Sequence, residues 1–311
     1  MAEQWNADPS PLAPEALAVT QSEIDQRVLD LYDEYCHGRL DRREFLQRAG
    51  ALTIGGVSAL AMAQALLPRY AQAQTISFTD QRIKARYVSY PSPAGNSGAM
   101  RGYLVQPNGA GPFPAVLVIH ENRGLNPYIE DVARRAATEG FLALAPDGLS
   151  PVGGYPGNDD DGRTLQAGLD QAKLRADMVN SARFLKSHGL SAGKLGVTGF
   201  CWGGSTTNFL AVALGADLSA AVPFYGAAAE TSAVPAIKAP LLIQYAENDD
   251  RINALWPAYE AALKASGARY EMHMYPGTQH GFHNNSTPRY HEAAAKLAWE
   301  RTIAFFKKHL A

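Results

Sequence analysis

A cysteine stands at the tip of a glycine-rich turn in the stretch "LGVTGFCWGGSTTNFLAVAL", which begins at Leu195. An apolar run ends just before Cys201, and after two glycines the apolar pattern resumes with helical spacing. Gly199 and Gly203 stand two positions before and after the cysteine, the spacing of a nucleophile elbow with Cys in place of Ser. The positive end of the following helix would favour the thiolate over the thiol. The turn therefore predicts a reactive thiol, although it is also compatible with an inert buried cysteine.

Two later segments supply the base and the acid that a thiol nucleophile needs. The segment "YAENDDRINALWPAYE" places Asp249 and Asp250 after an apolar run, and "YPGTQHGFHNN" places His280 after the next run. The chain order is nucleophile, acid and base, which is the order found in α/β-hydrolases. Simpler roles remain open, because Asp249 also fits a helix cap, and His280 and His283 fit exposed loop histidines. His120, in "VIHENRG", is predicted to be a packed residue.

Alternating strands and helices are expected to hold these residues at one edge of a sheet. Strands are predicted at 82–90, 100–107, 114–121, 141–146, 194–200, 218–226, 239–246 and 268–275, and helices at 127–139, 164–188, 202–214, 253–266 and 288–309. The first two strands flank a turn-rich segment and predict an antiparallel hairpin at one edge, whereas the later apolar runs predict buried parallel strands. The sequence therefore predicts an α/β fold, with a mostly parallel eight-stranded sheet and helices on both faces. Ligands bind beyond the carboxyl ends of such strands.

Four motifs in order resemble those of the dienelactone hydrolase family, from about Arg82 to His309. They are "HENRG" after the third strand, "GFCWGG", an Asp followed by x-x-Ile after the seventh strand, and "GTQHGF" after the eighth. The resemblance implies an α/β-hydrolase fold and a Cys-His-Asp triad. In that triad Cys201 is the nucleophile, His280 is the base and Asp249 orients the base. Asp249 is preferred to Asp250 because the family's aliphatic residue then falls on Ile252.

The resemblance also assigns roles to residues around the triad. Glu121 matches a glutamate that shares a proton with the thiol and helps to form the thiolate when substrate binds. The backbone N–H groups of Trp202 and Asn122 correspond to the oxyanion hole. No organic cofactor or metal is implied, and no Cys or carboxylate cluster accompanies His280 and His283, so no metal site is predicted.

One position departs from the family's pattern. Relatives that bind the carboxylate of dienelactone have an arginine four residues after the histidine, and here that position is Asn284. Arg163 and Arg289 are the candidates to replace this cation. Asn284, Tyr225 and Arg163 are the residues predicted to line the substrate pocket.

The predicted function is hydrolysis of a lactone or small carboxylic ester through a cysteine thioester, with a small molecule as the partner. A broader carboxylesterase or thioesterase is the alternative within the same class. An alternative from another class is a non-catalytic protein in which Cys201 is a binding or redox-sensing thiol. The predicted pair of His280 and Asp249 argues against it, because a sensor thiol needs no base oriented by an acid.

Composition excludes several other classes of protein. The chain has 311 residues, of which 46% are hydrophobic and 19% charged, and its net charge is −2. This balance is typical of a globular protein, and the near-neutral charge and the absence of a long Lys/Arg run argue against nucleic acid or anionic lipid as the main partner. Two cysteines in a chain of this length make no disulfide framework.

Residues 1–73 are predicted to be an N-terminal leader, followed by a single hydrolase domain at 74–311. Arg42 and Arg43 precede an apolar stretch at 49–67, and Ala73 ends an A-x-A pattern of the kind that signal peptidase cuts. This arrangement resembles a twin-arginine signal, and the export machinery is then a partner of the leader.

The leader prediction places the mature protein in the periplasm or outside the cell, without a stable membrane span. The stretch at 49–67 is long enough to span, but its Gly, Ala, Ser and Thr residues make it weakly hydrophobic. The alternative is a cytoplasmic protein that retains its N-terminal arm. That alternative is supported by the long segment before the arginines, and by Asp41 where such signals usually carry Ser or Thr.

Overall fold

The computed structural model describes residues 26–36, 39–52, 70–96 and 98–311. The chain divides into two compact units, Met1–Leu67 and Pro68–Ala311. Each unit is described by itself below.

The described part of the first unit is a pair of helices, α1 (Gln26–Cys36) and α2 (Arg42–Ala51). Their shared apolar core includes Tyr32, Tyr35 and Phe45, and the rings of Tyr35 and Phe45 stack with centroids 5.1 Å apart. Asp41 caps α2 by accepting a hydrogen bond from the backbone N–H of Glu44 at 2.7 Å. The apolar stretch at 49–67 lies mostly outside the described residues. Within the described parts of the chain, no helix has the length and apolar character needed to cross a membrane.

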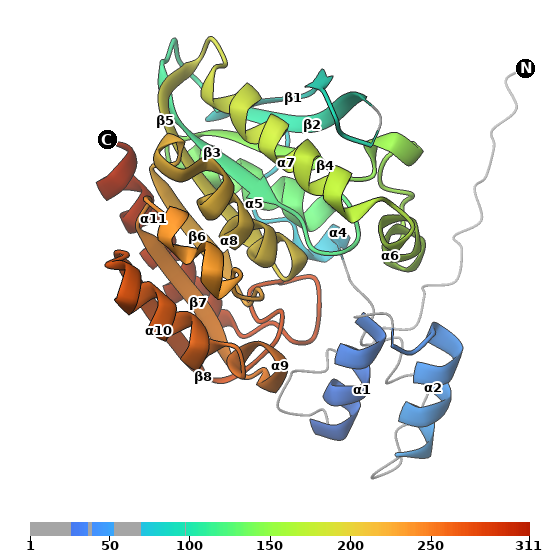
Figure 1. The fold of residues 1–311 in the computed structure, drawn as a ribbon. Helices are drawn as coiled ribbons and strands as arrows, with labels where there is room; N and C mark the ends of the chain where they lie inside the picture. Colours follow the sequence, from blue (N-terminus) through green and yellow to red (C-terminus); the bar gives the residue numbers. More distant parts are fainter. Residues whose placement is uncertain (1–25, 37–38, 53–69, 97) are drawn as a thin grey trace, which may run out of the picture. The chain divides into compact units, whose positions relative to one another are not determined.

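The second unit is built on one eight-stranded sheet (Figure 1). Its strands are β1 (Ile83–Ser92), β2 (Gly98–Pro107), β3 (Phe113–Ile119), β4 (Leu142–Asp147), β5 (Ser191–Phe200), β6 (Ala220–Phe224), β7 (Leu241–Asn248) and β8 (Tyr270–Gln279). The spatial order is β1-β2-β4-β3-β5-β6-β7-β8. The pairs β1–β2 and β2–β4 are antiparallel, and every other pair is parallel. The predicted α/β fold, with a mostly parallel sheet and a hairpin at one edge, is therefore confirmed.

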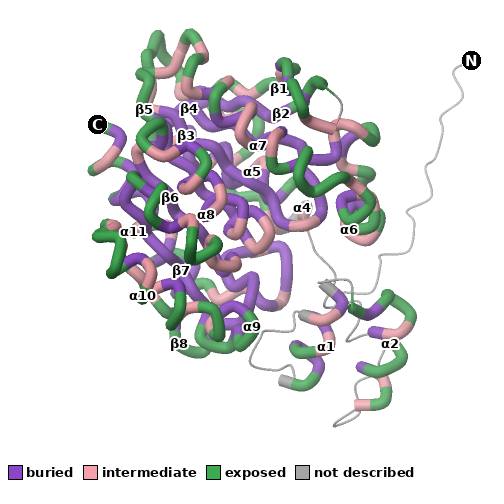
Figure 2. Tube along the Cα trace, viewed as in Figure 1, coloured by how far each residue is buried: buried purple, intermediate pink, exposed green. Residues whose placement is uncertain are grey.

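Helices cover both faces of the sheet, as predicted. They are α4 (Tyr70–Ala73), α5 (Pro127–Thr138), α6 (Asp159–Ala167), α7 (Gln171–Lys186), α8 (Trp202–Leu214), α9 (Asp250–Asn253), α10 (Trp256–Ser266) and α11 (Glu292–Leu310), with short 3-10 helices at Ser150–Val152, Gly215–Asp217 and Thr231–Ala236. Val116 and Val118 of β3 point into a core shared with α5 and α11. The alternate side chains of β3 point into a core shared with α7, α8 and α10. Figure 1 shows α7 and α8 in front of the sheet, and Figure 2 shows the central strands buried between the helices.

Three predicted helices differ from those observed, each for a local reason. The helix predicted at 164–188 is two helices, because Asp170 caps α7 by accepting hydrogen bonds from two backbone N–H groups. The helix predicted at 253–266 is interrupted between α9 and α10, where Pro257 stands in the first turn of α10. The last helix begins at Glu292 rather than 288, where the side chain of His291 caps it.

Candidate active site

Four predicted site residues follow the carboxyl ends of four parallel strands. Cys201 directly follows β5, Asp249 directly follows β7, and His280 directly follows β8. Glu121 comes two residues after the end of β3. Because β3, β5, β6, β7 and β8 are parallel, these ends lie along one edge of the sheet.

The turn at Cys201 has the strained geometry expected of a nucleophile elbow. Cys201 has φ 56° and ψ −112°, a conformation that non-glycine residues rarely adopt. A Cβ atom on Gly199 would lie 2.3 Å from the carbonyl oxygen of Gly203, and one on Gly203 would lie 2.3 Å from that of Ile119. Both positions therefore require glycine, and the partly buried Cys201 side chain stands at the N-terminus of α8 as a thiol outside any disulfide.

His280 and Asp249 form a buried pair. The Nδ1 atom of His280 and the Oδ2 atom of Asp249 are 2.6 Å apart, and their side chains are 4% and 3% exposed. The Asp249 side chain makes no capping hydrogen bond to α9, so the alternative role as a helix cap is wrong. Burial lowers the pKa of His280, but the charges of Asp249 and Cys201 and its hydrogen bonds to both more than offset this and hold the pKa well above its ordinary value. The imidazole is therefore placed to carry a proton beside the thiol.

His283 is also buried, so the exposed-loop alternative is wrong for both histidines. Its Nδ1 atom lies 2.6 Å from the hydroxyl oxygen of Tyr128, and its ring stacks on that of Phe200. Burial lowers the pKa of His283 well below its ordinary value. It is a packed neutral residue behind the site.

Glu121 is a buried carboxyl group that accepts a hydrogen bond from Asn284. The Asn284 Nδ2 atom lies 3.0 Å from Oε2 of Glu121. Burial raises the pKa of Glu121, the charge of Arg123 lowers it, that of Cys201 raises it, and that of Arg289 lowers it again. The protonation of Glu121 is therefore coupled to that of the thiol.

The three pocket candidates stand in different environments. Asn284 is buried and its side-chain oxygen accepts hydrogen bonds from the backbone and hydroxyl of Ser286, so both ends of its amide are engaged. Tyr225 is fully buried, and its ring centroid lies 5.0 Å from that of His280. Arg163 forms an ion pair with Asp160 of the same helix at 3.4 Å, and its place in a substrate pocket stays a prediction.

His120 joins the two segments that carry the predicted oxyanion donors. Its Nε2 accepts a hydrogen bond from the backbone N–H of Gly148 at 3.0 Å, so its proton is on Nδ1, which donates to the carbonyl oxygen of Glu121 at 2.5 Å. Its ring stacks on that of Trp202, with centroids 5.3 Å apart and planes at 14°. His120 is packed, as predicted, but the sequence did not reveal that it links Trp202 to the loop of Asn122. Only its position directly before Glu121 hinted at this contact.

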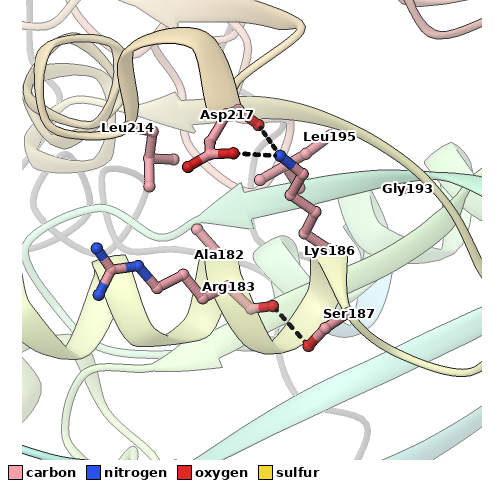
Figure 3. A pocket seen from close by; sticks show the side chains of 8 residues that line it. All are labelled: Ala182, Arg183, Lys186, Ser187, Gly193, Leu195, Leu214 and Asp217. Carbon is pink, nitrogen blue, oxygen red and sulfur yellow. Dashed lines mark hydrogen bonds and ion pairs between the residues drawn. The ribbon is translucent and has the colours of Figure 1, made fainter.

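A separate cavity of about 480 Å³ opens at the opposite end of β5 (Figure 3). It is lined by Ala182, Arg183, Lys186, Ser187, Gly193, Leu195, Leu214 and Asp217. Lys186 reaches across it to Asp217 at 2.7 Å. Leu195 precedes Cys201 by a stretch of strand on the order of 20 Å long, at about 3.3 Å per residue. The cavity is therefore remote from the catalytic edge. Among the residues that the structure describes, no group of three or more His, Cys, Asp and Glu side chains is placed to hold a metal ion.

Comparison with known proteins gives matches along most of the chain. The model described as "Dienelactone hydrolase family" matches residues 100–310, and one described as "YqhI-like" matches residues 18–53. The "Putative hydrolase fragment YghX" of Escherichia coli K12 is 62% identical over 115 residues, which cover 37% of this chain and 97% of that protein.

Longer matches cover most of the second unit. A "Putative carboxymethylenebutenolidase" of the same strain is 34% identical over 246 residues, which cover 74% of this chain and 89% of that protein. The crystal structure titled "Putative Dienelactone Hydrolase" from Klebsiella pneumoniae aligns with a TM-score of 0.62 at 30% identity, and covers 72% of this chain and 99% of that chain.

Proposed function

Because the chain belongs to the dienelactone hydrolase family, we propose that it hydrolyses a lactone or small carboxylic ester through a thioester on Cys201. The supporting observation is the buried contact of 2.6 Å between His280 and Asp249, on the edge of the sheet where the strained turn presents the thiol. An imidazole held by a carboxylate is the usual partner of a nucleophilic side chain.

In this proposal the reaction has two halves. The Cys201 sulfur attacks the substrate carbonyl carbon, and the thiol proton passes to His280, with Glu121 as an alternative holder of that proton. The backbone N–H groups of Trp202 and Asn122 stabilise the negative charge that develops on the carbonyl oxygen. The C–O bond breaks, and His280 returns its proton to the leaving alkoxide. Water then attacks the thioester with His280 as base, which releases the carboxylic acid and restores the thiol.

The proposal is tested by replacing the thiol in the full-length chain. Cys201→Ala should abolish hydrolysis across a panel of lactones, p-nitrophenyl esters and thioesters. Cys201→Ser should retain little activity, because a hydroxyl is far less acidic than a thiol. Cys36→Ser is the matched control, since it removes the other cysteine and should leave kcat/KM unchanged.

The same panel separates the alternatives. Undiminished hydrolysis by Cys201→Ala would contradict the covalent mechanism. A wild-type preference for thioesters, or similar turnover of esters of every size, would favour the broader carboxylesterase or thioesterase. Absence of hydrolysis with every substrate, together with reversible oxidation of Cys201, would favour the thiol-sensor alternative.

A further inference from the structure

A short segment before β1 is bonded to several parts of the active-site edge. This segment, Tyr70–Ile76, is called the strap here and contains α4. The side chains of Tyr70 and Ile76 pack against the core that α5 and α11 share with the sheet. The predicted leader ended inside the strap, at Ala73, yet the strap belongs to the compact unit that begins at Pro68.

The first anchor of the strap is the hydroxyl group of Tyr70. It donates a hydrogen bond to Oδ1 of Asp159 at 2.6 Å and accepts one from Nδ2 of Asn126 at 2.9 Å. Asp159 is the first residue of α6, and Asn126 caps α5. One hydroxyl group therefore joins the starts of two helices that border the site.

Asp159 also contacts Arg123. Its other oxygen, Oδ2, forms an ion pair with the Arg123 guanidinium at 2.6 Å, and the two side chains are 11% and 6% exposed. A buried ion pair of this kind depends on further hydrogen bonds to its carboxylate, which Tyr70 and Tyr155 donate. Arg123 stands two residues after Glu121, on the loop that carries Asn122.

The other end of the strap is held by the loop after β8. Nδ2 of Asn285 donates to the carbonyl oxygen of Ala73 at 2.7 Å. Asn285 directly follows Asn284, whose amide donates to Glu121. The backbone N–H groups of Thr75 and Ile76 donate to Asp131 of α5 at 3.0 and 2.8 Å.

We propose that the strap is part of the catalytic unit, and that Tyr70 is a positioning residue which holds Arg123 beside Glu121 through Asp159. A cut after Ala73 would remove Tyr70 and the carbonyl oxygen that Asn285 binds. The active chain therefore retains Tyr70, and any processing of the leader occurs before it. This inference takes one point from the proposed function, which is that Glu121 and Cys201 share a proton.

The charges around Glu121 set the direction of the expected effect. Burial raises its pKa, and the groups that face it are Arg123 on its own loop, Asp159 of α6, Cys201 at the elbow, Arg289 after β8, Tyr128 of α5 and Tyr225 after β6. Arg123 lowers the pKa of Glu121, whereas Asp159 raises it. If Arg123 moves away from Glu121, its positive charge no longer lowers the pKa of Glu121. The coupled pair of Glu121 and Cys201 then loses its first proton at a higher pH.

The test is Tyr70→Phe in the full-length chain, with Cys36→Ser as background so that Cys201 is the only thiol. We expect kcat/KM to fall about three- to tenfold, since the net contribution of one hydrogen bond is lost. We also measure the rate of Cys201 alkylation by iodoacetamide as a function of pH. We expect the acid limb of this profile, where the rate rises with pH, to move to higher pH. A merely structural role would lower thermal stability without moving this limb.

Tyr87→Phe is the matched control, because the Tyr87 hydroxyl, like that of Tyr70, donates to a carboxylate. Its acceptor is Glu130 of α5. This variant should leave both kcat/KM and the alkylation profile unchanged. An unmoved profile in Tyr70→Phe, or an equal shift in both variants, would overturn the proposal. If Tyr70→Phe does not fold, Asn285→Ala carries the same test from the other end of the strap, with a shift supporting the proposal and an unmoved profile overturning it.

N-terminal sequencing of the active protein gives a second test. We expect a first residue at or before Tyr70, and a chain that starts at Gln74 with wild-type kcat/KM would overturn the proposal. The alkylation profile can be measured without a substrate. If the protein hydrolyses no substrate, the proposed function is wrong, and the alkylation profile still tests the role of the strap.

Discussion

The family resemblance implies an arginine at the position of Asn284 in members that bind a carboxylate, and the Asn284 amide is bonded to Glu121 at 3.0 Å. An uncharged donor can orient the Glu121 carboxylate but offers no charge to an anionic substrate. Arg289 is buried, and its charge acts on Glu121, whose pKa it lowers. Substrate charge is therefore the property in which this chain is expected to differ from its relatives.

We predict that the enzyme prefers neutral esters or lactones to anionic ones. A charge-assisted contact is typically worth about 1.5–3 kcal/mol, so its loss lowers kcat/KM roughly ten- to hundredfold. The measurement compares a lactone that carries a free carboxylate with its methyl ester. Asn284→Arg should narrow the difference, and Asn284→Gln, which keeps an uncharged amide, is the control.

If the anionic lactone instead reacts tenfold faster in the wild type, another residue supplies the cation. Arg289 would then be the first to replace, since its charge acts on Glu121, and Arg163 the second.

At the scale of elements, the site depends on how closely the start of α8 approaches the ends of β3 and β5. A Cβ atom on Gly203 would stand 2.3 Å from the backbone oxygen of Ile119 and 2.5 Å from that of His120. Backbone atoms cannot yield as a flexible side chain can, so this approach fixes the height of Cys201 above the sheet.

We therefore predict that Gly203→Ala destabilises the protein, although Ala is favoured over Gly in helices by about 0.5–1 kcal/mol. The overpacking should cost about 1–3 kcal/mol or more in the free energy of unfolding, measured with urea. Gly189→Ala is the matched control, because Gly189 is exposed and has no atom within 4 Å of the added Cβ; it should change the free energy by less than about 0.5 kcal/mol. A Gly203→Ala variant as stable as the wild type would contradict this account of the turn.

The elements could be predicted well where local pattern determines them, and less well elsewhere. All eight strands were located within a few residues, and the short apolar runs of the central strands were readable because both faces of the sheet are buried there. α6 begins at Asp159, five residues before the start predicted at 164, and three consecutive Asp residues, Asp159–Asp161, form its first turn. Acidic side chains are in fact favoured in the first turn of a helix, and Asn158 caps this one.

The same limit applies to the candidate site. The elbow, the acid and the base are each readable in a few neighbouring letters, and the structure brings His280 and Asp249 together as expected. The contacts that orient their surroundings join distant positions. Tyr70 and Asp159 are 89 residues apart, and Arg123 and Asp159 are 36 apart, so no local spacing predicts them.

At the scale of the whole molecule, the described part of the first unit presents the paired arginines of the predicted leader. Arg42 and Arg43 lie exposed in the first turn of α2, directly after the capping Asp41. We propose that this pair is read as a twin-arginine signal, and that the protein acts in the periplasm or outside the cell. The strap requires only that processing spare Tyr70.

Residues 1–73, fused to a reporter that matures only when folded, should therefore drive export in a bacterial host. Replacing the pair by Arg42→Lys and Arg43→Lys should block export, since recognition of such signals depends on arginine rather than on charge alone. Arg39→Lys, outside the pair, is the control and should export normally. Reporter activity confined to the cytoplasm with the native segment would favour the retained-arm alternative.

The central claim is that catalysis passes through a thioester on Cys201. Its most direct test is intact-protein mass spectrometry of full-length Cys36→Ser protein, quenched in acid during turnover of a p-nitrophenyl ester. The account predicts a chain heavier by one acyl group, with the acyl group on the peptide that contains Cys201, and no such species in a chain that also carries Cys201→Ala. Steady turnover with the acyl group on another residue, or undiminished turnover after Cys201→Ala, would contradict it.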